Sequence, residues 1–214
     1  MLATATAAAA GCAPNGPPSS VVGVIVEDSC RPGLENGSGA LVAPGVVLTS
    51  AHVIAGARSI RVVSGGQSVP GRIVGFDPKM DLAYLAAEGL YGLPLTVSSA
   101  GVQAGDTGTA YVVRNGIVVD LPVTVKRRVD IRTEDVYVEG ETRRPGFELE
   151  AVVQGGDSGA AVVVDGKLAG VVWAQSRRAP DRSWAIDPDR AGDLIDEQLR
   201  TGVIGDEIDL SRCR

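Results

Sequence analysis

The sequence predicts an all-β protein made of two six-stranded antiparallel β-barrels followed by a C-terminal helix. First, the composition is 44% hydrophobic but only 4% aromatic, and the dominance of Val, Ala and Gly favours strands joined by many turns. Second, short apolar stretches bounded by turn residues recur along the chain. Third, residues 92–106 contain Gly, Pro, Ser and Ala without periodicity, which indicates a connection between two units. A chain of 214 residues is long enough for one large domain or two small ones.

The first half of the chain contains enough predicted strands for one small barrel. The clearest hairpin signal is Ala43-Pro44-Gly45, which separates two apolar stretches. A short helical turn is expected at His52, directly after the second of these stretches. The predicted strands are residues 20–26, 39–42, 46–50, 60–63, 72–76 and 82–85.

The second half repeats this organisation. Asp165-Gly166 is a strong tight-hairpin dipeptide. Asp187-Pro188 begins a predicted helix that continues to about Arg200, with Ala191, Leu194, Ile195 and Leu199 on one face. The predicted strands are residues 109–113, 117–125, 129–133, 136–139, 147–153, 160–164, 168–173 and 183–186. The expected division is therefore a linker or signal remnant (1–19), a first barrel (20–98), a second barrel (99–187), and a helix with a tail (188–214).

The stretch Gln154-Gly155-Gly156-Asp157-Ser158-Gly159 has the character of a nucleophile held on a tight turn. Glycine permits close backbone approach, and the N–H groups of Gly156 and Ser158 can point together at a developing oxyanion. A serine hydroxyl needs a base to take its proton, and that base needs a group to orient it. Gly-Asp-Ser-Gly alone is a common turn sequence, so the prediction depends on finding both partners elsewhere.

Both partners are present upstream of the serine. His52 is the only histidine of the chain, and Asp81 precedes the apolar stretch 82–85. Each has an ordinary explanation, a packed histidine and a strand-start aspartate. Their order, His then Asp then Ser, is one of the three known chain orders of the serine hydrolase triad. The combination predicts a catalytic triad of His52, Asp81 and Ser158.

These stretches resemble a known family. Residues 49–53 are similar to the histidine motif of chymotrypsin-like serine proteases, Asp81-Leu82-Ala83 to their aspartate motif, and residues 156–159 to their nucleophile motif. The resemblance covers residues 20–190. Within that clan the chain most resembles the acid-resistance periplasmic serine proteases of mycobacteria, which are membrane-anchored enzymes of actinobacteria. Gly37-Ser38-Gly39, Asp77-Pro78 and Val153-Gln154 carry this closer likeness.

The resemblance implies further features. A disulfide between Cys30 and Cys213 is implied, which would indicate an oxidising compartment. Val152 would lie at the base of the primary substrate pocket, and an apolar residue before the scissile bond is expected because no acidic residue is evident there. The implied pocket residues are Val152, Val153, Gln154, Val172, Trp173 and Ala174.

Three departures from the family pattern bear on the site. Ala160-Ala161 replaces the usual Gly-Pro after Gly159. Trp173 stands where many members have a serine that touches the catalytic aspartate. The stretch Tyr111-Val112-Val113-Arg114-Asn115-Gly116 replaces a glycine-rich loop. None of these changes removes a predicted catalytic group.

Charge and composition limit the other function classes. The formal net charge of -6 argues against nucleic-acid binding. The basic runs Lys126-Arg127-Arg128, Arg143-Arg144 and Arg177-Arg178 are expected to be solvated loop or strand ends. No cofactor is expected, and a chain with a single histidine is not expected to hold a zinc site. The expected partners are protein or peptide substrates bound by a monomer.

The first nineteen residues leave the location partly open. Ala9-Ala10-Gly11-Cys12 faintly resembles a lipoprotein processing site, with Cys12 as the lipidated residue, but a basic leader and a long apolar core are missing. No stretch reaches the 18–20 apolar residues or so of a membrane span. An extracytoplasmic location is expected, in the periplasm or cell envelope or after secretion, with a possible N-terminal anchor.

Two rival functions remain open from the sequence. The fold could be an inactive protease-like module that captures a peptide without cutting it, although no triad member is missing. The same triad could also serve an acyl-ester hydrolase. A serine endopeptidase of the bacterial cell envelope explains the sole histidine, the aspartate and the Gly-Asp-Ser-Gly stretch together, and is the function predicted here.

Overall fold

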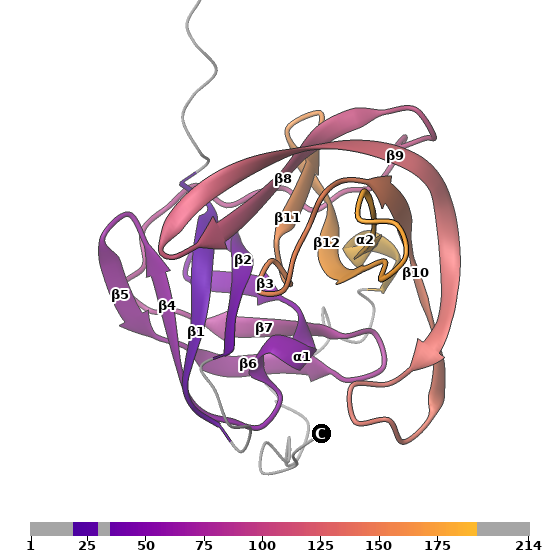
Figure 1. The fold of residues 1–214 in the computed structure, drawn as a ribbon. Helices are drawn as coiled ribbons and strands as arrows, with labels where there is room; N and C mark the ends of the chain where they lie inside the picture. Colours follow the sequence, from indigo (N-terminus) through magenta and orange to yellow (C-terminus); the bar gives the residue numbers. More distant parts are fainter. Residues whose placement is uncertain (1–18, 30–34, 192–214) are drawn as a thin grey trace, which may run out of the picture.

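The computed structural model describes residues 19–29 and 35–191, and its β-strands form two sheets that lie side by side (Figure 1). Apart from two short helices, α1 (Ala51–Ile54) and α2 (Pro188–Ala191), the regular structure of these residues is β. The predicted all-β fold is confirmed. The end of the predicted C-terminal helix lies outside the described residues.

The first sheet has seven antiparallel strands in the order β5-β4-β1-β2-β3-β7-β6. One strand more than predicted is present because β5 forms a tight hairpin with β4 around Gly65 and Gly66, both at positive φ. The sheet curls so that Gly71, just before β6, donates its N–H to the carbonyl of Ile60 in β4. The strands are β1 (Val21–Ser29), β2 (Glu35–Ala43), β3 (Val46–Thr49), β4 (Ala57–Ser64), β5 (Gln67–Pro70), β6 (Arg72–Asp77) and β7 (Leu82–Ala86).

The second sheet is a closed six-stranded barrel in the order β10-β13-β12-β11-β8-β9. Its longest strand, β9, crosses the top of Figure 1 and descends on the right before turning into β10. The strands are β8 (Thr107–Arg114), β9 (Ile117–Glu134), β10 (Glu141–Glu150), β11 (Ala161–Val164), β12 (Lys167–Gln175) and β13 (Arg182–Ile186).

Two expectations for the second half were wrong. Residues 117–125 and 129–133 were predicted as separate strands, but both belong to β9, and the register shift opposite Glu148 and Leu149 accommodates Lys126 within that strand. Residues 136–139 were predicted as a strand, but they form the turn between β9 and β10. Asp135 causes this, because its carboxylate accepts the N–H groups of Tyr137 and Glu139, and Val138 adopts a positive φ of 62°.

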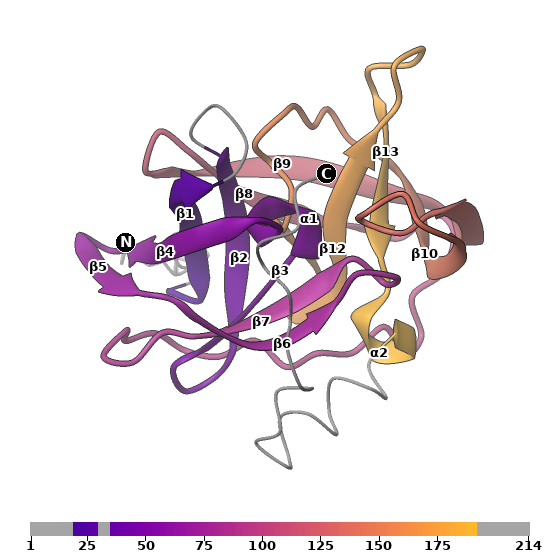
Figure 2. The same cartoon turned by 90° about the horizontal axis from the view of Figure 1, so that it is seen from below.

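Three apolar clusters hold this arrangement together. One fills the first sheet and one fills the barrel. The third joins Leu48, Leu82 and Tyr84 of the first sheet to Leu168 and Ile186 of the barrel. Burial of such side chains stabilises by roughly 25 cal/mol per Å² of apolar surface. The two sheets therefore share a packed interface, and the residues predicted as a triad lie along it. Figure 2 shows the two sheets from below.

Candidate active site

His52 and Asp81 come together at one end of the first sheet. His52 lies in α1, directly after β3, and Asp81 directly precedes β7, the neighbour of β3. The His52 Nδ1 lies 2.8 Å from Asp81 Oδ2, and the His52 backbone N–H donates to Asp81 Oδ1, also at 2.8 Å. The Asp81 side chain is 3% exposed and that of His52 is 24% exposed. The buried Asp81 carboxylate thus fixes the imidazole ring, while the other ring nitrogen, His52 Nε2, can reach solvent or substrate.

A tight turn before β7 sets the direction of the Asp81 carboxylate. Asp77 accepts the backbone N–H groups of Lys79 and Met80 at 2.8 and 2.9 Å, which closes the turn. Asp81 itself has φ of 59°, a left-handed conformation that Asp tolerates better than most residues. Its carbonyl accepts the N–H of Ala51 at 3.1 Å. Both the backbone and the side chain of Asp81 are therefore bound to α1.

Ser158 lies in the loop between β10 and β11, which is docked onto the first sheet. The Ser158 carbonyl accepts the N–H of Ser38 in β2 at 2.8 Å. The next residue, Gly159, has φ of 84°, and a Cβ there would collide with the Ser38 carbonyl and the Thr49 hydroxyl. Only glycine lets the loop pass this close to β2 and β3. These contacts bring half-buried Ser158 to the same interface as His52.

The predicted oxyanion groups belong to this loop. Gly156 has φ of 94°, which only glycine adopts readily. Within the described residues, neither the Gly156 N–H nor the Ser158 N–H is used in a hydrogen bond to the protein. Two free backbone donors beside a serine hydroxyl are suited to stabilising a negatively charged oxygen.

The residue before the serine, Asp157, is fully buried and is paired with Arg114 of β8. The Arg114 Nε and Nη2 donate to its two carboxylate oxygens at 2.9 and 2.6 Å, and Gln154 donates its N–H to Oδ2 at 2.8 Å. This hydrogen bond raises the pKa of Arg114 above its ordinary value. Arg114 belongs to the stretch that departs from the family pattern, and it anchors the loop of Ser158.

Arg144 is a site residue that sequence reasoning missed. The paired arginines at 143–144 were expected to be solvated; Arg143 is exposed, but the Arg144 side chain is 4% exposed, and its Nη1 lies 3.6 Å from Asp81 Oδ2. Its guanidinium carbon lies 4.9 Å from the ring centre of Trp173. Only the alternation of residues along the strand could have indicated the burial of Arg144, because Thr142 and Gly146 are buried on either side of it.

The residues implied for the substrate pocket lie around the same loop and the end of β12. Val152 is 64% exposed, Gln154 is exposed, and Trp173 and Ala174 are half-buried. Val153 and Val172 have their side chains in the core of the barrel, so they can contribute to a substrate site only through their backbone. The indole N–H of Trp173 is buried without a hydrogen-bond partner among the described residues.

A cavity of ≈ 150 Å³ opens beside His52 and Asp81, and its wall includes Arg144 and Trp173. Across the described part of the chain, no hydrogen bond joins the side chains of His52 and Ser158, and such bonds are often long before substrate binds. In the same residues there is no group of three or more His, Cys, Asp or Glu side chains placed to hold a metal ion.

Two further sequence predictions fall on residues that the structure does not describe. These are the Cys30–Cys213 disulfide and the lipidation of Cys12. For the membrane, the finding is limited to helices: none within residues 19–29 and 35–191 is long and apolar enough to cross a bilayer.

Comparison with known proteins shows which family the chain belongs to. The chain is 29% identical over 177 residues to the serine protease Rv3671c of Mycobacterium tuberculosis, a match that covers 81% of this chain and 44% of that protein. It is 31% identical over 173 residues to the mitochondrial serine protease HTRA2 of Bos taurus, covering 76% of this chain and 36% of that protein. The chain thus spans less than half the length of these relatives.

Solved structures show the same fold. The active form of the Rv3671c protease superposes with a TM-score of 0.79 at 23% identity, covering 92% of this chain and 86% of that one. The HtrA-type protease AlgW with a tripeptide gives a TM-score of 0.74 at 23% identity, covering 86% and 62%. Residues 37–171 match the trypsin-like peptidase domain, and this range includes His52, Asp81 and Ser158. The chain belongs to the trypsin-like peptidase family, as the resemblance of its motifs predicted.

Proposed function

We propose that the protein is a serine endopeptidase in which His52, Asp81 and Ser158 form the catalytic triad. The observation that carries the proposal is the pair of 2.8 Å hydrogen bonds from the sole histidine to a buried aspartate, at the interface on which the Ser158 loop is docked. Membership of the trypsin-like peptidase family supports the same assignment.

In this mechanism His52 Nε2 takes the proton from the Ser158 hydroxyl as the oxygen attacks a peptide carbonyl carbon. The C–N bond breaks when His52 returns that proton to the leaving amine, and an acyl-enzyme ester remains on Ser158. Water then attacks the ester in the same way and restores Ser158. Asp81 accepts the Nδ1–H, which selects the tautomer with a free Nε2 and stabilises the imidazolium.

The loop supplies the oxyanion donors. The N–H groups of Gly156 and Ser158 stabilise the negative oxygen of each tetrahedral intermediate, and one such donor contributes roughly 10²–10³-fold in rate. An extended substrate would pair with the strand edge at the end of β12, where Trp173 and Ala174 lie. Val152, Gln154, Trp173 and Ala174 would line the primary pocket and favour an apolar residue before the scissile bond.

The proposed setting is extracytoplasmic, in the bacterial cell envelope, with protein or peptide substrates and a monomeric enzyme. The Cys30–Cys213 bridge belongs to this proposal, since such a bridge persists in oxidising compartments. The proposed boundary between the two barrels falls between residues 98 and 99. A linker is proposed for residues 1–19, and a helix and tail for residues 188–214.

Labelling with a fluorophosphonate probe tests the proposal. Wild-type protein should be labelled at Ser158, whereas Ser158→Ala and His52→Ala should not be labelled, and Ser68→Ala, which removes an exposed serine of β5, should label like wild type. Cleavage of an unfolded protein substrate then distinguishes an endopeptidase from an ester hydrolase. A folded, oxidised wild type that is not labelled would overturn the proposal in favour of a peptide-binding module.

A further inference from the structure

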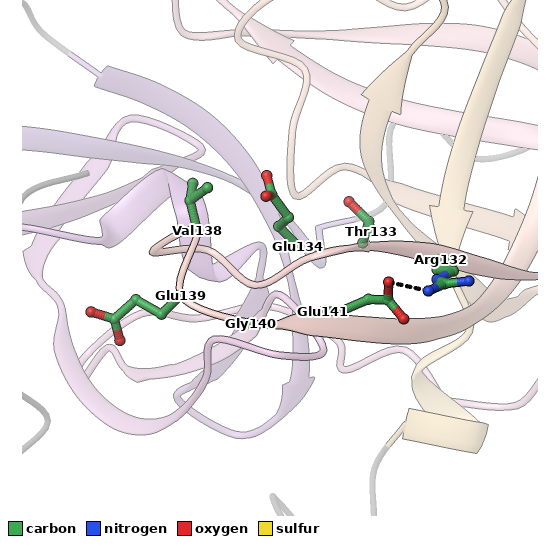
Figure 3. A pocket seen from close by; sticks show the side chains of 7 residues that line it. All are labelled: Arg132, Thr133, Glu134, Val138, Glu139, Gly140 and Glu141. Atoms are coloured by element: carbon green, nitrogen blue, oxygen red, sulfur yellow. Dashed lines mark ion pairs between the residues drawn. The ribbon is translucent and has the colours of Figure 1, made fainter.

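The turn between β9 and β10 reaches from the barrel onto the first sheet. The buried Val136 belongs to the apolar core of the first sheet, and its N–H donates to the Pro78 carbonyl at 2.9 Å. The rings of Tyr137 and Phe76 are 6.2 Å apart. Figure 3 shows the side chains around this hairpin end, where Thr133 and Glu134 line both a cavity of ≈ 460 Å³ and the smaller cavity beside His52. The hairpin therefore forms one wall of the active site.

Arg144 extends from this hairpin to the carboxylate of Asp81. Its Nε donates to the Lys79 carbonyl at 2.8 Å and its Nη2 to the Glu134 carbonyl at 3.1 Å, while Nη1 lies 3.6 Å from Asp81 Oδ2. The first bond holds the turn that carries Asp81, and the second holds the end of β9. A buried guanidinium in this position both braces the turn and places a positive charge beside the aspartate.

Trp173 completes the setting of this guanidinium. Its ring lies under Arg144 at 4.9 Å, and a ring face attracts a cation. Arg144 and Trp173 both line the cavity beside Asp81, so the second side chain next to that aspartate, after His52, carries a positive charge.

The other charged groups around the pair are mostly acidic. Glu134 and Asp135 line the same cavity, and Arg144 is the one cation among the described residues that do so. Asp77 and Lys79 lie in the turn before Asp81, where the Asp77 carboxylate is bound by two backbone N–H groups. Removing Arg144 would therefore take away the one Lys or Arg side chain that lines this cavity among the described residues. Glu134 and Asp135 would remain there and would favour a positive charge on His52 in such a variant.

We propose that Arg144 is a positioning residue of the active site, which holds Asp81 against His52 and places a positive charge beside that pair. The inference rests on the proposed function, since it assigns Arg144 a role in the same reaction. This role accounts for the position of Arg144, a buried cation on the β9–β10 hairpin of the barrel that lies beside a carboxylate of the first sheet.

Because His52 is the sole histidine of the chain, its titration can be followed by NMR without any need for activity. Arg144→Met should raise the midpoint of that titration by about half to one pH unit, and the acidic limb of the pH dependence of kcat/KM should move with it. Arg144→Lys keeps the charge and should leave the midpoint within about 0.2 units of wild type. Arg143→Met, on the adjacent exposed side chain of the same strand, is the matched control and should leave it unchanged.

An unchanged midpoint in folded Arg144→Met, or an equal shift in Arg143→Met, would overturn the inference. The inference would also be overturned if the Met and Lys variants lost activity equally and the acidic limb of the kcat/KM profile did not shift. Arg144 would then have a purely structural role. If Arg144→Met does not fold, Arg144→Gln removes the charge but keeps an amide donor for the carbonyls, and the same shift is expected. If the His52 midpoint shifts in Arg144→Met but the wild type is not labelled by the probe, only the proposed function is refuted.

Discussion

Each half of the site contains a buried aspartate beside an arginine, but the two pairs differ in geometry. Arg114 binds Asp157 through both of its carboxylate oxygens at 2.6 and 2.9 Å. Arg144 stays 3.6 Å from Asp81, whose oxygens are instead taken by the ring and the backbone of His52 at 2.8 Å. The Asp157 carboxylate binds an arginine with both oxygens and so fixes the shape of a loop. The Asp81 carboxylate binds His52 with both oxygens and so can stabilise that histidine when it gains a proton.

The two pairs also connect different parts of the molecule. Arg114 and Asp157 both belong to the barrel, so their contact fixes the Ser158 loop within one unit. Arg144 belongs to the barrel and Asp81 to the first sheet, so their contact acts across the interface. Substitution at Asp157 should therefore affect mainly stability, and substitution at Asp81 mainly catalysis.

Asp81→Asn should have the largest effect on activity. The amide cannot accept the Nδ1–H while keeping its present bonds, so the wrong tautomer of His52 is favoured and kcat/KM should fall by about 10⁴-fold. The urea midpoint should fall less than in Arg114→Met, because the shape of the side chain is kept and Arg144 retains its bonds to the Lys79 and Glu134 carbonyls. Comparison with Asp157→Asn in the same assays is the control, and a larger loss of activity in the Asp157 variant would reverse the assignment of the two pairs.

Arg114→Met should have the largest effect on stability. It leaves the carboxylate of Asp157, whose side chain is 1% exposed, buried without a cation, which costs about 3–5 kcal/mol when one partner of a buried pair is removed. Urea denaturation measures this loss. Arg114→Lys retains the charge but not the two-pronged geometry and should lose less. A Met variant as stable as wild type would show that the pair does not hold the loop.

The sequence allowed the triad to be predicted but not the arginines that support it. His52, Asp81 and Ser158 stand in short motifs whose residue types and order are restricted by their chemistry. Arg114 and Arg144 are restricted only by which side chains the fold brings together, and charge alone predicts a solvated arginine. Arg114 and Asp157 are 43 positions apart in the sequence, and Arg144 and Asp81 are 63 apart. No local sequence pattern therefore contains both members of either pair.

The fold was predictable in class and less so in detail, for physical reasons. Alternation and turn residues located most strands, since both are local signals. The turn at residues 135–140 was missed because Val136 and Tyr137 have strand-forming side chains, whereas the Asp135 carboxylate and the packing of Val136 in the core of the first sheet determine its conformation. The missed turn and the missed arginine belong to the same hairpin, which is where the two units interact.

The smallest effect on stability is expected for the exposed pair of Lys126 and Glu150. Their charged atoms are 2.7 Å apart, as close as those of Arg114 and Asp157, but the side chains are 50% and 54% exposed. The hydrogen bond lowers the pKa of Glu150 and raises that of Lys126. The stabilisation from Glu150 is thus present above its ordinary pKa and lost as the pH falls, and that from Lys126 is lost only at strongly alkaline pH.

Water and salt screen the attraction in such an exposed pair, and the loss of side-chain entropy on fixing two long side chains offsets much of what remains. Lys126→Met should therefore leave the urea midpoint at pH 7 unchanged within error, at low and high salt alike. Glu150→Gln should lower the urea midpoint only slightly at pH 7, and that small difference from wild type should disappear at pH 3, where Glu150 is protonated. If either substitution destabilised the protein as much as Arg114→Met, distance alone would decide the strength of these pairs, and burial could not explain why Asp157 and Asp81 need their arginines.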